Sequence, residues 1–219
     1  MAKEWFRNKT WSEAIESEFL KQLEQTDNSM KINALKIQGD LWLGNNDAVT
    51  QQAGCRLLEK LLADYMNDPQ DAATVLEILG EYYYKQTDFE IAEMYLQQVV
   101  VYYREFKRTG VVRKADLLLA ECILLHRQTD RFEEAYELVH QYPNLGGSLT
   151  EDHEKHSYYE ILAYLSYALG KKEEAADCAR QAIAIAQTIE LDFLLAKAPA
   201  IEKCYQQLTP LAEIAGNKQ

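Results

Sequence analysis

The sequence predicts an all-α chain made of successive helix pairs, and three observations lead to that prediction. Apolar residues recur at spacings of three, four and seven along long segments, which is the period of an amphipathic helix. Only four prolines and nine glycines occur in 219 residues, and they cluster at intervals with long segments between them. No segment has the strict alternation of apolar and polar residues that is typical of a strand.

The breaks delimit ten expected helices. They are predicted at residues 12–25, 30–44, 48–66, 71–86, 89–105, 111–128, 131–141, 151–169, 172–188 and 190–208. Thr10 and Glu13 have the spacing of a capping box for the first helix, and Thr150 is expected to cap the eighth. Pro199 is expected to kink or interrupt the last helix, because proline lacks the backbone N–H that a helix interior needs.

Composition predicts one elongated domain over residues 1–219 and excludes some classes of partner. A hydrophobic content of 47% is enough to bury a core. The 35 acidic and 23 basic residues give a net charge of −12, and both halves of the chain are acidic. Binding to nucleic acid or to anionic lipid depends on Lys and Arg, so we expect neither nucleic acid nor a membrane as a partner.

The cysteines and the N-terminus predict a reducing, cytoplasmic location. Cys55, Cys122, Cys178 and Cys204 are far apart in sequence and form no CxxC pair. Each lies in an apolar helical stretch, where cysteine behaves as a small hydrophobic residue. The opening "MAKEWFRNKTW" lacks the apolar core of a signal peptide, and no apolar run reaches the roughly 20 residues of a membrane span.

Two segments of the chain share a pattern of small residues. Residues 73–106 and 156–189 match at an offset of 83, about twice 41. Gly80 and Ala163 occupy the eighth position of each segment, and Ala92 and Ala175 occupy the twentieth. Small residues at these positions allow two antiparallel helices to approach closely while larger side chains fill the flanking spaces.

At these residues the chain resembles the tetratricopeptide repeat family. The resemblance implies a right-handed α-solenoid of antiparallel helix pairs. It implies about four repeats, at 30–66, 73–106, 112–142 and 156–189, between an N-terminal helix in 1–28 and a C-terminal capping helix and tail in 190–219. The opening "EWFRNKTWSEAIESEFLKQL" also resembles some bacterial proteins with degenerate repeats of this kind.

Two of the four repeats depart from the family pattern. In the first, Gly39, Trp42 and Asp47 fit, but Ala53 comes about two residues late. In the third, Ala120 and Ala135 are 15 residues apart where the family has 12, which predicts a longer turn around "HRQTDRF".

The resemblance implies a concave groove that binds a protein segment. The candidate groove residues are Asp40, Glu77, Glu81, Tyr84, Glu121, Glu160, Tyr164 and Tyr167. The ninth positions of the four repeats are Asp40, Glu81, Glu121 and Tyr164, and three of these side chains are acidic. An acidic groove disfavours the C-terminal carboxylates that some family members bind. We expect instead a basic or amphipathic segment; the alternative is that these acids are simply solvated. Tyr83, one position earlier than Tyr84, is expected to pack within its helix pair.

Several functional classes remain compatible with this pattern. The first is a non-catalytic adaptor or scaffold that binds a protein or peptide. The second is a stoichiometric inhibitor or immunity-type protein whose acidic body masks a basic partner surface. Self-association through residues 190–208 is a third, although capping of the repeat stack is the default role for such a helix.

Catalysis, cofactors and metals are not expected. The sequence has no GxGxxG, GxxxxGK[ST], GxSxG or HExxH motif, so we predict neither an enzyme nor a cofactor. His153 and His156 in "DHEKH" are three residues apart and resemble half of a metal site. Because no third ligand is recognisable, we expect both to be surface histidines and predict no metal.

Overall fold

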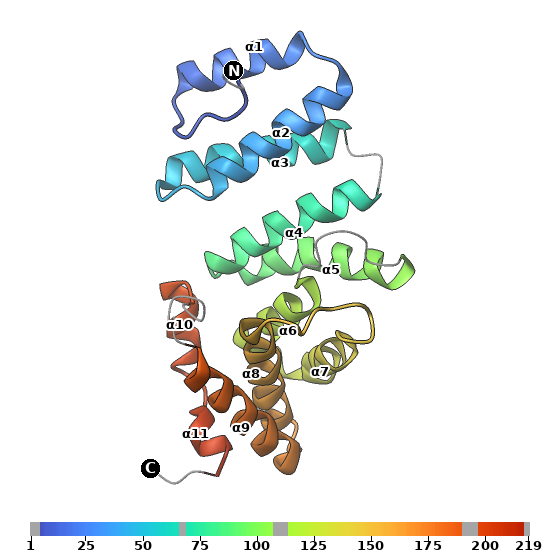
Figure 1. Cartoon of the computed structure of the whole chain (residues 1–219), viewed down its shortest axis with the longest axis vertical. Helices are drawn as coiled ribbons and strands as arrows, with labels where there is room; N and C mark the ends of the chain where they lie inside the picture. Colours follow the sequence, from blue (N-terminus) through green and yellow to red (C-terminus); the bar gives the residue numbers. More distant parts are fainter. Residues whose placement is uncertain (1–4, 66–68, 107–113, 190–196, 217–219) are drawn as a thin grey trace. The chain divides into compact units, whose positions relative to one another are not determined.

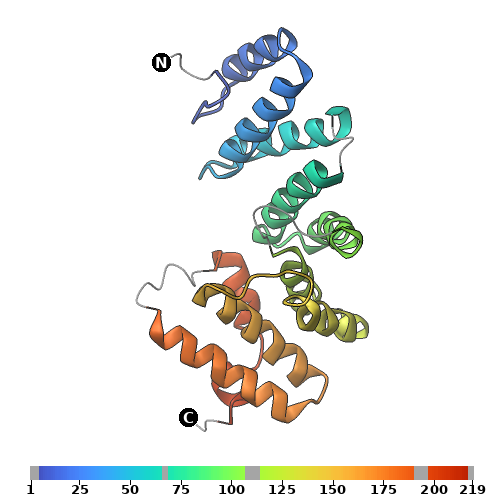
Figure 2. The same cartoon turned by 45° about the vertical axis from the view of Figure 1, so that its right-hand side comes forward.

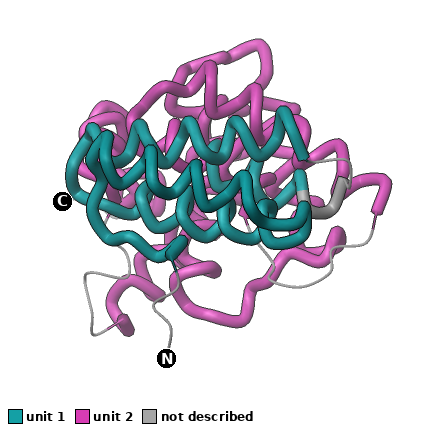
Figure 3. The backbone as a smooth tube through the Cα atoms, turned by 90° about the horizontal axis from the view of Figure 1, so that it is seen from above, with its two compact units in different colours: residues 1–79 teal, residues 80–219 magenta. Residues whose placement is uncertain are grey.

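The computed structural model describes residues 5–65, 69–106, 114–189 and 197–216, and within these ranges it contains helices and no strand (Figure 1). Consecutive helices pack against one another, so the predicted all-α class is confirmed. The chain divides into two compact units, residues 1–79 and 80–219 (Figure 3), and each is described by itself. The sequence does not mark this division, because it falls inside one helix, α4 (Pro69–Lys85).

Unit 1 contains α1 (Glu13–Glu24), α2 (Asn28–Leu43), α3 (Ala48–Tyr65) and the first part of α4. Two glycines bring α2 and α3 together. A Cβ atom on Gly54 would lie 2.7 Å from both the Gly39 carbonyl oxygen and the Leu43 amide nitrogen. Gly39 therefore lies at the contact between the helices, as the family pattern predicts. Its partner on α3 is Gly54, which the sequence analysis did not identify because it assigned the small contact position to Ala53.

Residues 5–12 cover one side of unit 1 through aromatic packing and one buried amide. The Trp5 ring centroid lies 5.3 Å from that of Phe19. The fully buried Gln38 donates from Nε2 to the Asn8 carbonyl oxygen at 2.8 Å and accepts from the Asn8 amide at 2.9 Å. The side chain of Ser12 caps α1 by accepting from the Ile15 amide, so the predicted cap at Thr10 was wrong.

Unit 2 begins with the end of α4. Its other helices are α5 (Phe89–Glu105), α6 (Ala115–Leu125), η1 (Thr129–Arg131), α7 (Phe132–Gln141), α8 (Asp152–Ala168), α9 (Lys172–Thr188), α10 (Pro199–Tyr205) and α11 (Leu211–Ile214). The pairs α6–α7 and α8–α9 pack closely. A Cβ on Gly80 would lie 2.7 Å from the Leu96 side chain, and Ala163 and Ala175 are fully buried, which agrees with the predicted contact positions.

The predicted longer turn between α6 and α7 is confirmed. It contains Arg127, whose φ is +56°, and the 3-10 helix η1. The Arg131 guanidinium donates to both carboxylate oxygens of Glu134, at 2.8 and 2.9 Å, and pairs with Glu93 of α5. These bonds hold the additional residues of the turn against α5 and α7. The cap of α8 is Glu151, which forms a capping box with Glu154, so the cap predicted at Thr150 was wrong.

The C-terminal region differs from the single predicted helix at 190–208. Pro199 is the first residue of α10, because proline fits the first turn of a helix but not its interior. The first part of that predicted helix, residues 190–196, lies outside the described residues. α11 packs against α8 and α9 (Figure 2), with Ile214 buried and Arg180 donating to the Ala215 carbonyl oxygen at 3.1 Å.

Candidate functional site

Four of the eight predicted groove residues come together inside unit 2. We call Tyr84, Glu121, Glu160 and Tyr164 the tyrosine–carboxylate cluster. They come from the end of α4, from α6 and from α8, and none of them is more than 8% exposed. Glu160 and Tyr164 lie one helical turn apart on α8 and therefore share a face. Burial and the nearby charge of Glu121 raise the pKa of Tyr84.

Burial sets the electrostatics of the two carboxylates. The pKa of Glu121 is raised by burial and by the nearby charge of Glu160, although hydrogen bonds from two tyrosine hydroxyls act in the opposite direction. The pKa of Glu160 is likewise raised by burial, against the attraction of Lys197. Two acids held together in a buried place favour a cation or a hydroxyl donor as a ligand.

Residues 197–205, which we call the C-terminal segment, occupy the cluster. The Lys197 ammonium donates to Glu160 Oε2 at 2.8 Å and to Oε1 at 3.1 Å. The Tyr205 hydroxyl donates to Glu121 Oε1. The ring of Tyr205 lies 5.6 Å from the ring of Tyr164, and the Lys197 ammonium lies over the Tyr205 ring, 4.3 Å from its centroid.

His156 borders the cluster, one turn before Glu160 on α8. It is only 7% exposed, so the prediction that it is a surface histidine was wrong. Burial and the positive charge of Lys197 lower the pKa of His156 to about 4, which leaves the ring neutral near pH 7. His153 is half-buried. Across the described ranges, no three His, Cys, Asp or Glu side chains are placed to hold a metal ion together.

The other four predicted groove residues lie outside the cluster. Asp40 and Glu77 belong to unit 1, where Asp40 is exposed on α2 and Glu77 is buried. Glu81 pairs with Lys85 at 2.7 Å on the surface of α4. Tyr167 is 45% exposed near the end of α8. A binding role for these four stays a prediction.

Tyr83 packs within its helix pair, as the sequence predicts. Its ring stacks on that of Tyr95 from α5, with 5.8 Å between centroids and 16° between planes. The adjacent Tyr84 points instead to the cluster, where it meets Glu121. The two adjacent tyrosines therefore divide between packing and the candidate site.

Sequence reasoning missed Lys197, Tyr205 and His156. The available signal was the spacing of Lys197, Ile201 and Tyr205, which are four residues apart and so fall on one face if the segment is helical. Ile201 is buried, in agreement with that spacing. The contact between this segment and α6 joins residues 84 positions apart, Glu121 and Tyr205, which no local pattern reveals.

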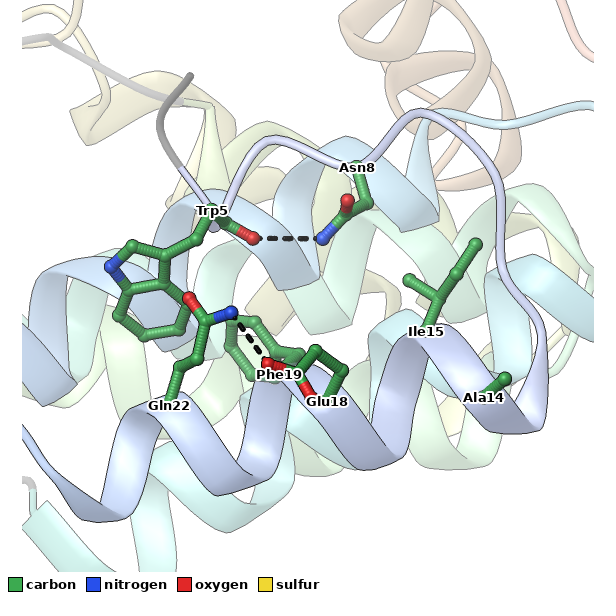
Figure 4. A pocket seen from close by; sticks show the side chains of 7 residues that line it. All are labelled: Trp5, Asn8, Ala14, Ile15, Glu18, Phe19 and Gln22. Atoms are coloured by element: carbon green, nitrogen blue, oxygen red, sulfur yellow. Dashed lines mark hydrogen bonds between the residues drawn. The ribbon is translucent and has the colours of Figure 1, made fainter. Parts of the chain in front are cut away.

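Each unit also has a surface hollow. The hollow of unit 1 has a volume of about 380 Å³ and is lined by Trp5, Asn8, Ala14, Ile15, Glu18, Phe19 and Gln22 (Figure 4). Gln22 donates to Glu18 at 2.8 Å, and the Asn8 side chain donates to the Trp5 carbonyl oxygen at 2.9 Å. The hollow of unit 2, about 420 Å³, lies between residues 103–106 and 144–146. Neither hollow contains a buried charged group comparable to those of the cluster.

The described helices include none that is long and apolar enough to cross a membrane. Comparison with protein-family models and with curated proteins gives no match for the chain. The geometry of the tyrosine–carboxylate cluster is thus the observation that bears most directly on function.

Proposed function

We propose that the chain is a non-catalytic protein-binding module, built as a tetratricopeptide-like solenoid, and that its tyrosine–carboxylate cluster holds a basic or amphipathic segment of a partner. One observation carries this proposal. The cluster already binds a segment of that chemistry, because Glu160 accepts the Lys197 ammonium and Glu121 accepts the Tyr205 hydroxyl. Charged and hydroxyl donors that pair with buried carboxylates give selectivity as well as binding energy.

The repeat architecture supports this proposal. The helices of the pairs α2–α3, α6–α7 and α8–α9 pack against each other, and this packing supports a solenoid of helix pairs. Repeat proteins bind extended segments along the faces that successive pairs leave available. The cluster draws on two such pairs, through Glu121 of α6 and Glu160 of α8.

A non-catalytic role accounts for the ionisable groups of unit 2. Burial and direct partners explain the shifted pKa values of Glu121 and Glu160, so acid–base duty is not needed to explain them. Burial raises the pKa of Cys178 to about 11, and the buried Cys122 is shifted in the same direction. Such thiols stay protonated and are poor nucleophiles. We place the module in a reducing cytoplasm, where buried thiols of this kind persist.

Affinity capture from a native extract tests the proposal, with the full chain as bait. We compare the wild-type chain with a Glu121→Gln, Glu160→Gln variant, which keeps side-chain size and removes both charges. The matched control is Glu173→Gln, Glu213→Gln, which removes two exposed charges from the same unit. Helix content and melting temperature are measured for all three baits.

A partner retained by the wild-type chain and the control, but lost with the cluster variant, is the expected result. The complex should also weaken at high salt, because part of its binding energy is ionic. Capture of the same partner by a folded cluster variant would contradict a binding role for the cluster.

A further inference from the structure

The C-terminal segment presents three side chains to unit 2 at a regular spacing. Lys197, Ile201 and Tyr205 are four residues apart, and Ile201 and Tyr205 lie on one face of α10. Lys197 pairs with Glu160, Ile201 is 1% exposed, and Tyr205 donates to Glu121. The segment therefore pairs with the cluster through a lysine that precedes α10 and a tyrosine on α10, and it buries an aliphatic side chain between them. Amphipathic helices commonly bind a partner surface through regularly spaced side chains of this kind.

This contact is a poor way to add stability. Burying a carboxylate is costly, and replacing a buried ion pair by apolar residues of similar size is often neutral or stabilising. A segment that served only as a cap would be expected to use apolar contacts. The same C-terminal region contains such a cap, because α11 buries Ile214 and Ala215 against α8 and α9.

The two polar side chains of the segment, Lys197 and Tyr205, contact each other as well as the cluster. The Lys197 ammonium lies over the Tyr205 ring, and that ring lies beside Tyr164. Exchanging either side chain for one of another type leaves a buried carboxylate without its partner. The cluster consequently discriminates among segments by chemistry, and this is the property of a recognition site.

We propose that the tyrosine–carboxylate cluster is a docking site for a segment of another protein that carries lysine, an aliphatic residue and tyrosine at four-residue intervals, and that residues 197–205 are the chain's own copy of this ligand, which the partner replaces. The inference rests on the proposed function and adds the chemistry of the partner and the competition for the site. Because the internal copy belongs to the same chain, it competes at an effective concentration on the order of millimolar. Partner binding to the wild-type chain is weakened accordingly.

A synthetic peptide of residues 197–208, KAPAIEKCYQQL with Cys204→Ser and an N-terminal fluorophore, serves as the probe. It is titrated against the full-length wild-type chain and against a full-length Lys197→Glu, Tyr205→Phe variant, in which repulsion from Glu160 and loss of the hydroxyl weaken the internal contact. The matched control is Lys203→Glu, which makes the same charge change at an exposed lysine of the same helix. We expect the peptide to bind the first variant at least about tenfold more tightly than it binds the wild-type chain or the control.

A charge exchange tests which residues read the peptide. A full-length Glu160→Lys, Tyr205→Phe chain, in which the introduced lysine repels the chain's own Lys197, is expected to lose the original peptide and to bind a Lys197→Glu peptide. A Lys203→Glu peptide should bind like the original. Equal binding of all three peptides by one chain would overturn the assignment of Glu160 as the reader of the lysine.

A second measurement uses the wild-type chain, so that it does not depend on the folding of any variant. Excess peptide should accelerate amide hydrogen exchange of residues 197–205 in the intact chain, while the Lys197→Glu peptide should not. If the peptide neither binds the weakened variant nor accelerates this exchange, the proposal is overturned, even where affinity capture still depends on Glu121 and Glu160. A wild-type dimer that the peptide dissociates would assign the cluster to a second copy of the chain and overturn it as well.

Discussion

Units 1 and 2 both contain consecutive helices that pack against each other, but different interactions dominate their best-defined contacts. In unit 1, α2 and α3 meet at Gly39 and Gly54, where backbone lies against backbone. In unit 2, α6 and α8 instead present Glu121 and Glu160 to a lysine and a tyrosine of the C-terminal segment. The first contact is close-packed and has no room for change. The second is polar and selective, which is what reversible binding requires.

The largest expected effect is on the glycine contact of unit 1. Gly54→Ala places a Cβ 2.7 Å from two backbone atoms that cannot move independently, so the variant should lose about 3 kcal/mol of unfolding free energy. Gly44→Ala is the control, because its Cβ would have a nearest neighbour at an ordinary 3.6 Å. Trp5, Trp11 and Trp42, the three tryptophans of the chain, all lie in unit 1, so urea unfolding followed by tryptophan fluorescence measures this unit. Equal midpoints for the two variants would contradict the close approach of α2 and α3.

The next effect concerns the ion pair of unit 2. Lys197→Met removes the hydrogen-bonding cation of the buried Glu160 carboxylate and should cost about 2 to 3 kcal/mol. The double variant Glu160→Met, Lys197→Met removes both charges and should recover most of that loss. Urea unfolding followed by circular dichroism checks both, because tryptophan fluorescence does not report on unit 2. A double variant that is less stable than Lys197→Met would mean that the pair mainly stabilises the fold.

A smaller effect is a dependence of stability on pH through His156. Its pKa is lowered to about 4 in the folded chain from 6.5, so between these values the unfolded chain binds more protons than the folded one. Stability should therefore fall as pH decreases from about 6.5 to about 4, by about 2 kcal/mol. The raised pKa values of Glu121 and Glu160 act in the opposite direction, so the contribution is read as the difference between the wild-type chain and His156→Gln. Parallel pH profiles for the two chains would contradict a buried neutral His156.

The smallest effect is expected at Glu81. Its carboxylate pairs with Lys85 on the surface, and such exposed pairs contribute little because water and salt screen them. Glu81→Lys should change the unfolding free energy by less than about 0.5 kcal/mol. A larger loss of unfolding free energy, measured by thermal melting, would contradict the assignment of Glu81 to an exposed surface pair.

Local patterns were enough to predict α1 to α9. The predicted bounds 89–105 and 172–188 coincide with α5 and α9, because apolar spacing, the polar breaks and small contact residues all agree there. The longer turn before α7 was also readable from the spacing of Ala120 and Ala135. Caps were less predictable, since Ser12 competed with Thr10 and only the backbone geometry decides between them.

The occupant of the candidate site could not be predicted in the same way. Tyr84, Glu121, Glu160 and Tyr164 were identified from the repeat register, which fixes the face of each helix. Lys197 and Tyr205 follow Ile189, the end of the last repeat, and belong to no register. Their contacts join segments 37 and 84 residues apart, so tertiary packing alone assigns them.

Amide hydrogen exchange tests the central claim most directly, namely that Glu121 and Glu160 hold the C-terminal segment. We compare the wild-type chain with Glu121→Gln, Glu160→Gln under native conditions. Faster exchange in residues 197–205 of the variant, with α2 and α3 of unit 1 unchanged, is the predicted result. Unchanged exchange in residues 197–205, or equal acceleration in both units, would contradict the claim.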